Sequence, residues 1–234
     1  MNDGDAAPSE RALRLRDSRA LLLAEVLLVA GLFLADAWHH VFFSKTPYLL
    51  LLGWVSLRLR GMRWRDVGFS AGPQWKTFAL AGVLAGIVIE GLELFVTQPL
   101  LARATGQLPD LSDFTDLVGN LQLLMEVIAG AWILAALGEE LVWRGWLLNR
   151  CADLFGRNRA GWIAALVVSS VAFGLAHAYQ GSIGVTENII DGALLAGVYF
   201  ACGRNLLAPM VAHGITDTVD ALIIFSGHYP GLTK

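Results

Sequence analysis

The sequence predicts an all-α fold, a polytopic bundle of about seven transmembrane helices. Hydrophobic residues make up 56% of the 234 residues, and the mean hydropathy is positive at +0.57. Charged residues account for only 16%, against about 25% in a typical soluble domain. The apolar residues also gather in runs of about twenty, the length that a helix needs to cross about 30 Å of hydrocarbon. These observations predict one membrane domain.

Seven such runs occur along the chain, and the second and sixth are the shortest. The second contains Lys45 and Pro47, and Asp191 with several glycines interrupts the sixth. The first run follows a long polar segment, so we expect it to remain as an anchor rather than to be removed as a signal peptide. The predicted spans are 20–38, 41–57, 78–101, 121–147, 160–178, 188–202 and 205–225.

Arginine and lysine placement predicts the orientation of these spans, because short cytoplasmic loops are enriched in both residues. Basic residues precede the first span, separate the second from the third, and follow the fourth and the sixth. They are Arg11, Arg14, Arg16, Arg19, Arg58, Arg60, Arg63, Arg65, Lys76, Arg150, Arg157, Arg159 and Arg204. The loop before the fourth span is acidic instead, with Asp110, Asp113 and Asp116. We expect a cytoplasmic N-terminus, a non-cytoplasmic C-terminus and a location in the lipid bilayer of a bacterial inner membrane.

The predicted organisation is a cytoplasmic tail over 1–19, one transmembrane domain over 20–226 and a short tail over 227–234. The net charge of −3, with no basic stripe, excludes nucleic acid as a partner. Cys151 and Cys202 have neither metal-site spacing nor the density of a disulfide-rich domain, so we expect two free thiols. The oligomeric state stays open, because nothing in the sequence indicates it.

Three groups that contain ionisable side chains stand out inside the predicted spans. Within a bilayer such a side chain must face the bundle interior or a water-filled cavity and find a partner, which makes it a functional-site candidate. The three groups are Glu139, Glu140 and Arg144 on the fourth span, Phe173 and His177 on the fifth, and His213 and Asp217 on the seventh. A single intramembrane histidine is usually a helix–helix hydrogen bonder, but two histidines together with a glutamate favour a shared site.

Helical geometry separates the two glutamates of the fourth span. Residues four apart share a helix face, so we expect Arg144 to neutralise Glu140, while Glu139 points about 100° away. Glu140 is then a structural carboxylate, and Glu139 is free to act as a general base in an apolar cavity. The alternative is that all three charges form a buried structural network.

Depth along the helices gives a second check, at about 1.5 Å of rise per residue. If the fourth span ends near Arg150, Glu139 lies about 16 Å from that end, and His213 and Asp217 lie about 10 to 17 Å in. His177 comes out near 25 Å, too deep by about one and a half turns. The predicted boundaries therefore place His177 away from the other candidates.

The remaining intramembrane carboxylates have no histidine close in sequence. We interpret Glu90 and Glu93 as cavity-facing or helix-pairing groups, because buried charges are normally paired. The same interpretation covers Glu25, Asp36, Glu126, Asp191 and Asp220. Ser169 and Ser170 lie roughly on the face of His177, but no glycine-framed motif surrounds them, so a serine–histidine mechanism is a weaker alternative.

The three motifs together resemble those of the CPBP family of membrane proteases (CAAX protease and bacteriocin-processing, also called Abi), whose eukaryotic relatives are the type II CAAX prenyl endopeptidases. The similarity covers about residues 60–226 and rests on WRDVGFS, EELVWRG, FGLAH and GRNLLAPMVAHGITD. It implies a glutamate-dependent intramembrane endopeptidase. By this resemblance Glu139 matches the glutamate that activates the attacking water, and His177 helps to hold that water. Glu140 and Arg144 complete the first motif.

The resemblance also implies that His213 stabilises the oxyanion, while Asp217 stands where the family carries Asn or Asp. An ionised carboxylate only accepts hydrogen bonds, so it cannot stabilise an oxyanion directly. We therefore expect Asp217, four residues after His213 on the same face, to orient the histidine and favour its protonated form. On this hypothesis Asp217→Asn retains much of the activity and shifts its pH profile.

Metal dependence is open, because carboxylate and imidazole groups together can bind Zn²⁺. No His-Glu-x-x-His motif occurs, so we favour a mechanism without a cofactor and keep zinc as the alternative. The leading hypothesis is hydrolysis of a peptide bond in a membrane-associated protein or peptide, prenylated or not. One alternative is a proton-coupled transporter, although the two halves show no repeated hydropathy pattern. Another is a catalytically silent membrane binding protein, although all the motif residues are present.

Overall fold

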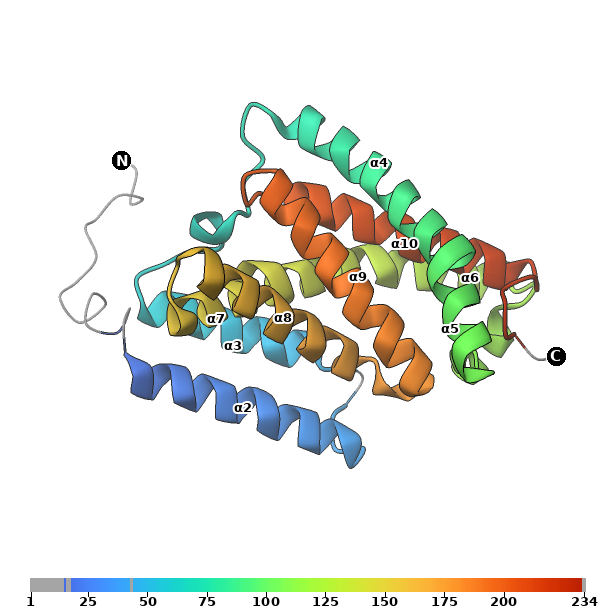
Figure 1. Ribbon diagram of the computed structural model, residues 1–234, viewed down its shortest axis with the longest axis horizontal. Coiled ribbons are helices and arrows are strands. Elements are labelled where there is room, and N and C mark those ends of the chain that lie inside the picture. The colour runs from blue at the N-terminus through green and yellow to red at the C-terminus, as the bar shows by residue number, and fades with distance from the viewer. Residues whose placement is uncertain (1–14, 16–17, 43, 233–234) are drawn as a thin grey trace.

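The computed structural model describes residues 15, 18–42 and 44–232, and these residues form helices and connections without any β-strand (Figure 1). The predicted all-α fold is confirmed, while most of the predicted tail over 1–19 lies outside the described residues. The helices are α2 (Arg19–Ala37), α3 (Thr46–Leu59), α4 (Trp75–Leu92), α5 (Gln98–Thr105), α6 (Leu121–Gly130), α7 (Leu148–Phe155), α8 (Arg159–Ala176), α9 (Gly181–Ala201) and α10 (Leu207–Phe225). Short 3₁₀ turns cover Trp64–Val67, Ser112–Leu117 and Ala178–Gln180, and π-helical turns cover Glu93–Thr97, Ala131–Glu139 and Leu141–Leu147.

Six helices among the described residues are long and apolar enough to cross a membrane. They are Arg19–Ala37, Trp75–Thr105, Leu121–Phe155, Arg159–Ala176, Ala178–Ala201 and Leu207–Phe225. The second predicted span is the exception, because α3 has 14 residues, or about 21 Å of length against about 30 Å of hydrocarbon. Helix α3 begins only at Thr46, since Pro47 occupies its first turn, where a missing N–H is tolerated. Leu121–Phe155, which joins α6 to α7 through two π-helical turns, is called the long helix below.

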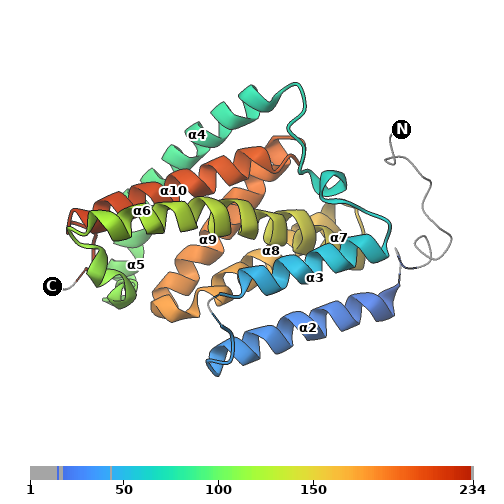
Figure 2. The ribbon, with the colours of Figure 1, turned by 180° about the vertical axis from the view of Figure 1, so that it is seen from behind.

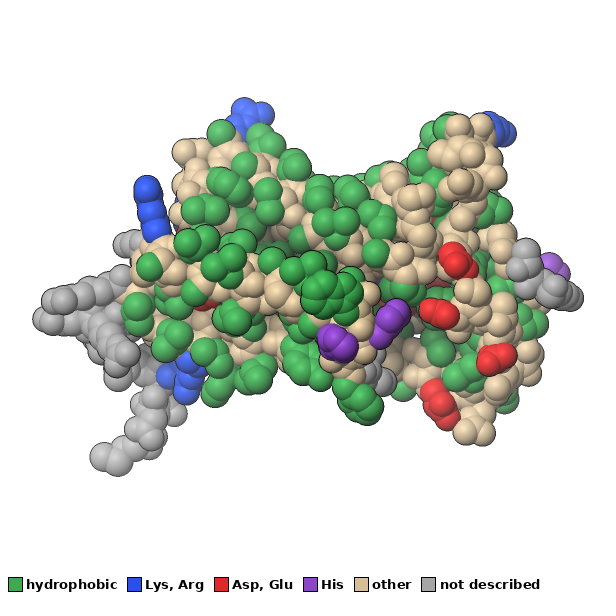
Figure 3. Space-filling model, turned by 90° about the horizontal axis from the view of Figure 1, so that it is seen from below, with side chains coloured by type: hydrophobic (Ala, Val, Ile, Leu, Met, Phe, Trp, Pro, Cys, Tyr) green, Lys and Arg blue, Asp and Glu red, His purple; other side chains and the backbone are tan. Residues whose placement is uncertain are grey.

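The connections between helices fall at two ends of the bundle. The start of α2, the α3–α4 connection, the α7–α8 turn and the α9–α10 turn lie at one end, while the α5–α6 loop and the C-terminus lie at the other (Figure 1). Most of the basic residues used to predict the topology belong to the first end, and the acidic loop belongs to the second. Figure 3 shows one face, on which acidic side chains gather at one end, most basic side chains lie toward the other, and apolar side chains spread between them. That the basic end is cytoplasmic stays a prediction.

Helix α10 lies between α4 and the long helix (Figures 1 and 2). Two glycines of α4 allow the close approach. A Cβ atom at Gly82 would lie 2.5 Å from the carbonyl oxygen of Ala208, and one at Gly86 would lie 2.7 Å from that of Ala212. Small residues at such contacts let membrane helices pack backbone against backbone. This packing fixes the position of α10, the helix that carries His213.

Two ion pairs join α2 to α3 and to the segment before it. Arg60 Nη1 lies 2.5 Å from Glu25 Oε1, and Lys45 Nζ lies 2.5 Å from Asp36 Oδ2. The helix-pairing interpretation is therefore confirmed for Glu25 and Asp36. It is wrong for Glu126, which is exposed on the outer face of α6 and accepts a hydrogen bond from a residue one turn earlier on the same helix.

Cys151 and Cys202 are free thiols, as predicted. The described part of the segment after α10 packs back onto the bundle. Tyr229 is 6% exposed, and its hydroxyl oxygen accepts a hydrogen bond of 2.9 Å from Nε2 of Gln98 at the start of α5. The end of α10 is therefore held against α5 at the end of the bundle that carries the acidic loop.

Candidate active site

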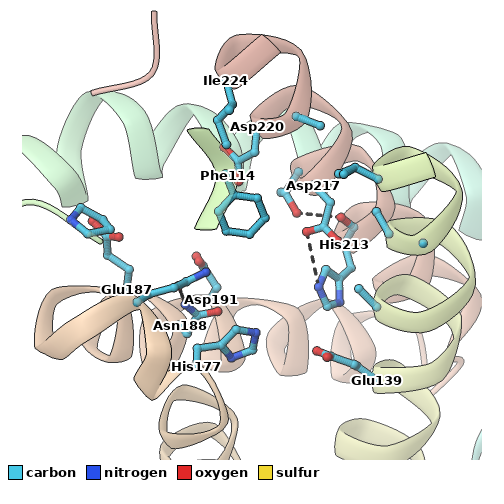
Figure 4. Close-up of a pocket in the computed structure, with 18 of the residues that line it drawn as sticks. Phe114, Glu139, His177, Glu187, Asn188, Asp191, His213, Asp217, Asp220 and Ile224 are labelled. Carbon is cyan, nitrogen blue, oxygen red and sulfur yellow. Dashed lines mark hydrogen bonds and ion pairs between the residues drawn. The ribbon is translucent and has the colours of Figure 1, made fainter. Parts of the chain in front are cut away.

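A cavity of about 460 Å³ lies between the long helix, α8, α9 and α10. Four of the six predicted site residues line this cavity (Figure 4). They are Glu139, His177, His213 and Asp217. The other two, Glu140 and Arg144, are fully buried in the wall behind it, with exposed fractions of 0% and 2%. The predicted site is thus one cavity with a buried ion pair at its back.

The predicted mismatch in depth between His177 and Glu139 came from a misplaced helix end. The long helix continues past Arg150 to Phe155, and α8 begins at Arg159, immediately after the turn. Measured from these ends at 1.5 Å per residue, Glu139 lies about 24 Å in and His177 about 27 Å in. These two depths agree, whereas His213 lies only about 9 Å into α10 by the same measure. Its contact with Glu140 shows that α10 begins deeper in the bundle than α8.

The two glutamates stand where the π-helical segments Ala131–Glu139 and Leu141–Leu147 meet. Such i→i+5 turns are rare and frequently mark functional sites. The predicted ion pair is nevertheless present, with Arg144 Nη1 2.6 Å from Glu140 Oε1. Glu140 is turned into the protein, and Glu139 reaches the cavity. The predicted separation of the two carboxylates is confirmed.

Glu140 is the centre of a buried network that joins three helices to the long helix. Its Oε1 accepts hydrogen bonds from Nη1 of Arg144 and, at 2.9 Å, from Nδ1 of His213 on α10. Arg144 Nη2 donates to the Gly192 carbonyl oxygen of α9 at 3.1 Å, and the guanidinium lies 4.6 Å from the ring centre of Phe173 on α8. The network holds α8, α9 and α10 against the long helix, and therefore positions the cavity walls.

The sequence had suggested that Asp217 orients His213. In the structure, Glu140 is the closer partner of the ring. The Nδ1–Glu140 contact of 2.9 Å is a hydrogen bond, whereas Nε2 lies 3.6 Å from Asp217 Oδ1, which is beyond normal hydrogen-bond length. Sequence spacing could indicate Asp217, one turn away on the same helix, but not a partner from another helix. Asp217 faces the outer ring nitrogen, on the cavity side.

Glu139 and His177 each present an acceptor to the cavity. Oε1 of Glu139 accepts a hydrogen bond of 3.3 Å from Thr46 Oγ1 at the start of α3, while Oε2 has no hydrogen-bond partner among the described residues. Nδ1 of His177 lies 2.9 Å from the Phe173 carbonyl oxygen. A carbonyl only accepts, so Nδ1 carries the proton and Nε2 of the neutral ring is an acceptor. Two acceptors in one cavity suit a water molecule that donates both of its hydrogens.

Further carboxyl side chains line the same cavity beyond His213. They are Glu93, Glu187, Asp191 and Asp220. The cavity-facing interpretation is confirmed for three of them, and Glu90, buried beside Asp220, belongs to the same cluster. Glu187 is a residue that the sequence reasoning missed. Its signal was the four-residue spacing to Asp191, which places both carboxyl groups on one face of α9.

The serine and metal alternatives find no support in the geometry. Oγ of Ser169 donates to the Leu166 carbonyl oxygen at 3.1 Å, and neither Ser169 nor Ser170 lines the cavity. Within the described part of the chain, no group of three or more His, Cys, Asp and Glu side chains is placed so as to hold a metal ion. A mechanism without a metal stays a prediction.

Residues 121–219 match the family of type II CAAX prenyl endopeptidases described as Rce1-like. The matched segment contains every predicted site residue, from Glu139 to Asp217. The resemblance predicted from the three motifs is therefore confirmed over this segment, and it supports a peptidase embedded in the membrane. No curated protein and no solved structure matches the chain significantly.

Proposed function

We propose that this Rce1-like chain is an intramembrane endopeptidase, which hydrolyses a peptide bond of a membrane-associated protein or peptide with a water activated by Glu139 and His177. One observation carries the proposal. Glu139, whose Oε2 has no hydrogen-bond partner among the described residues, and His177, whose Nε2 is an acceptor, line one cavity inside the segment that matches a peptidase family. A general base must reach the proton that it abstracts, and these two groups offer that geometry to a single water.

The reaction needs only the groups that line the cavity. A water that donates one hydrogen to Glu139 and the other to His177 directs a lone pair at the carbonyl carbon of the substrate. Attack forms the new C–O bond, transfers one proton to Glu139 and places negative charge on the carbonyl oxygen. Collapse of this intermediate breaks the C–N bond, and Glu139 returns the proton to the leaving nitrogen. The products are a carboxylic acid and an amine.

His213 supplies the donor to the oxyanion. Its Nδ1 donates to Glu140, and its Nε2 faces Asp217 and the cavity. Carboxylates beside both ring nitrogens suit a ring in which both nitrogens carry hydrogens, so that Nε2–H is available to a developing oxyanion. A donor that is already fixed in place is effective, and removal of one such donor typically lowers kcat by about 10²- to 10³-fold.

The proposal is tested with the full chain reconstituted in liposomes and a library of membrane-associated peptides, prenylated and unprenylated, analysed by mass spectrometry. Wild-type protein should cleave, and Glu139→Gln and His177→Ala should lower the rate at least about 100-fold. Ser169→Ala is the matched control, because its side chain is buried outside the cavity, and it should cleave normally. Cleavage by folded Glu139→Gln protein contradicts the proposal. Wild-type liposomes that cleave nothing but conduct protons would favour the transporter.

A further inference from the structure

The cavity extends past the candidate active site into a region that we call the acidic subsite. It consists of four carboxyl side chains from α9, α10 and the π-helical turn after α4. They are Glu93, Glu187, Asp191 and Asp220. No Lys or Arg stands among the described residues that line the cavity, and the proposed hydrolysis uses none of the four carboxyl groups. Because buried charges are normally paired, their cation is expected to come from outside the cavity.

Helix periodicity aligns the acidic subsite with the candidate active site. On α10, His213, Asp217 and Asp220 follow one another at spacings of four and three residues, so they form one row. On α9, Glu187 and Asp191 form a second row at a spacing of four. All five line the cavity, and Figure 4 shows both rows around it. A peptide bound with its scissile bond at His213 would therefore extend between these two rows of carboxyl groups.

Several buried carboxyl oxygens of this cluster have no hydrogen-bond partner among the described residues. Glu93, Asp191 and Asp220 line the cavity, and Glu90 is buried beside Asp220. Both carboxyl oxygens of Glu90 and Oδ1 of Asp220 are buried without a hydrogen-bond partner among the described residues, and a carboxylate can only accept hydrogen bonds. Glu187 is in the same position. It is 4% exposed, lines the cavity, and its Oε1 makes no hydrogen bond within the described residues.

We infer that the acidic subsite binds a cationic side chain, Lys or Arg, of the peptide substrate, an inference that rests on the proposed peptidase function. An ammonium carries three N–H donors and a guanidinium five, and both lack acceptors. Such a group supplies the donors that the carboxyl oxygens lack, and it pairs with Glu187. A neutral side chain of the same length fills the space but leaves Glu187 buried and unpaired, which is unfavourable.

The helix rise gives the distance between this subsite and the bond that is cleaved. From His213 to Asp220, α10 advances about 10 Å at 1.5 Å per residue. An extended peptide advances about 3.4 Å per residue. The cationic residue is therefore expected within about three residues of the scissile bond, always on the same side of it.

The test compares peptides that differ in one side chain, with the full chain in liposomes. A peptide that the library shows to be cleaved is prepared with Lys or with norleucine, its uncharged analogue, at each of the three positions on either side of the bond. At one of these positions, the kcat/KM of the Lys peptide should exceed that of the norleucine peptide by on the order of tenfold. Glu187→Gln should abolish this ratio while hydrolysis of the norleucine peptide is unchanged, and Asp191→Asn serves as a second variant. Glu126→Gln, which removes an exposed carboxylate outside the cavity, should keep the ratio.

The outcomes separate this inference from the proposed function. Wild-type protein that cleaves the Lys and norleucine peptides equally at all positions overturns the inference and leaves the peptidase standing. If no peptide is cleaved at all, the proposed function fails, and the subsite is tested by calorimetric binding to wild-type protein of one library peptide prepared with Lys and with norleucine at the same position. Equal affinities for the two peptides would show that the acidic subsite does not bind a cationic side chain. Tighter binding of the Lys peptide would support the inference.

Discussion

Removal of one partner of the buried Glu140–Arg144 pair should destabilise the protein far more than replacement of both. The two side chains are 0% and 2% exposed, with 2.6 Å between Oε1 and Nη1. Arg144→Met leaves the carboxylate buried with His213 as its remaining partner, and also removes the hydrogen bond to Gly192 and the contact with the Phe173 ring. Loss of one member of a buried pair lowers the free energy of unfolding by about 3 to 5 kcal/mol.

The double variant Glu140→Leu, Arg144→Met should recover part of that loss, because two apolar side chains avoid the desolvation of both charges, while the buried Nδ1 of His213 loses its acceptor. Unfolding in mixed detergent micelles, followed by circular dichroism, gives the coupling energy of the pair from a double-mutant cycle. The double variant should still cleave poorly, because His213 loses the oxygen at 2.9 Å that orients it. An Arg144→Met protein within about 1 kcal/mol of wild type, or a fully active double variant, would refute this reasoning.

Three further predictions follow from single contacts. Gly86→Ala should lower the free energy of unfolding by about 1 to 3 kcal/mol, because its Cβ would lie 2.7 Å from a carbonyl oxygen of α10; Gly91→Ala, with nothing within 4 Å, is the matched control and should not destabilise. Thr46→Val removes the hydrogen bond to the Glu139 carboxylate, and kcat should fall by about 10- to 150-fold, as for one hydrogen bond to a charged group; total loss would show that α3 contributes more than this contact. Asp217→Asn should retain much of the activity, since 3.6 Å separates its carboxylate from the histidine ring; an inactive variant with an unchanged fold would make Asp217 essential.

Much of the fold could be predicted from the sequence, because bilayer thickness sets the length of an apolar helix. The exception, α3, is short for a local reason, the proline at its first turn. The π-helical turns of the long helix could not be predicted, since they change the hydrogen-bond pattern without leaving a signal in apolar periodicity. The end of the long helix at Phe155 was missed because its last turns carry polar residues, which hydropathy alone assigns to a loop.

The candidate site was predictable where its residues interact within one helix. The spacing of Glu140 and Arg144 indicated their ion pair, and the same geometry assigned Glu139 to another face. Contacts between helices had no such signal, so the hydrogen bond between Glu140 and His213 was missed. Glu187 was missed because an acidic residue near a predicted helix end is normally solvated, and only the packing of α9 shows it buried in the cavity.

The rate of peptide hydrolysis by Glu139→Gln protein tests the central claim most directly. Single-turnover cleavage of one library-identified peptide is compared among wild type, Glu139→Gln and the exposed-carboxylate control Glu126→Gln, each shown by circular dichroism to be folded. Loss of the general base predicts a rate about 10²- to 10⁴-fold below wild type for Glu139→Gln, with the control unchanged. A folded Glu139→Gln protein that cleaves as fast as the control would contradict the assignment of Glu139 as the group that activates water.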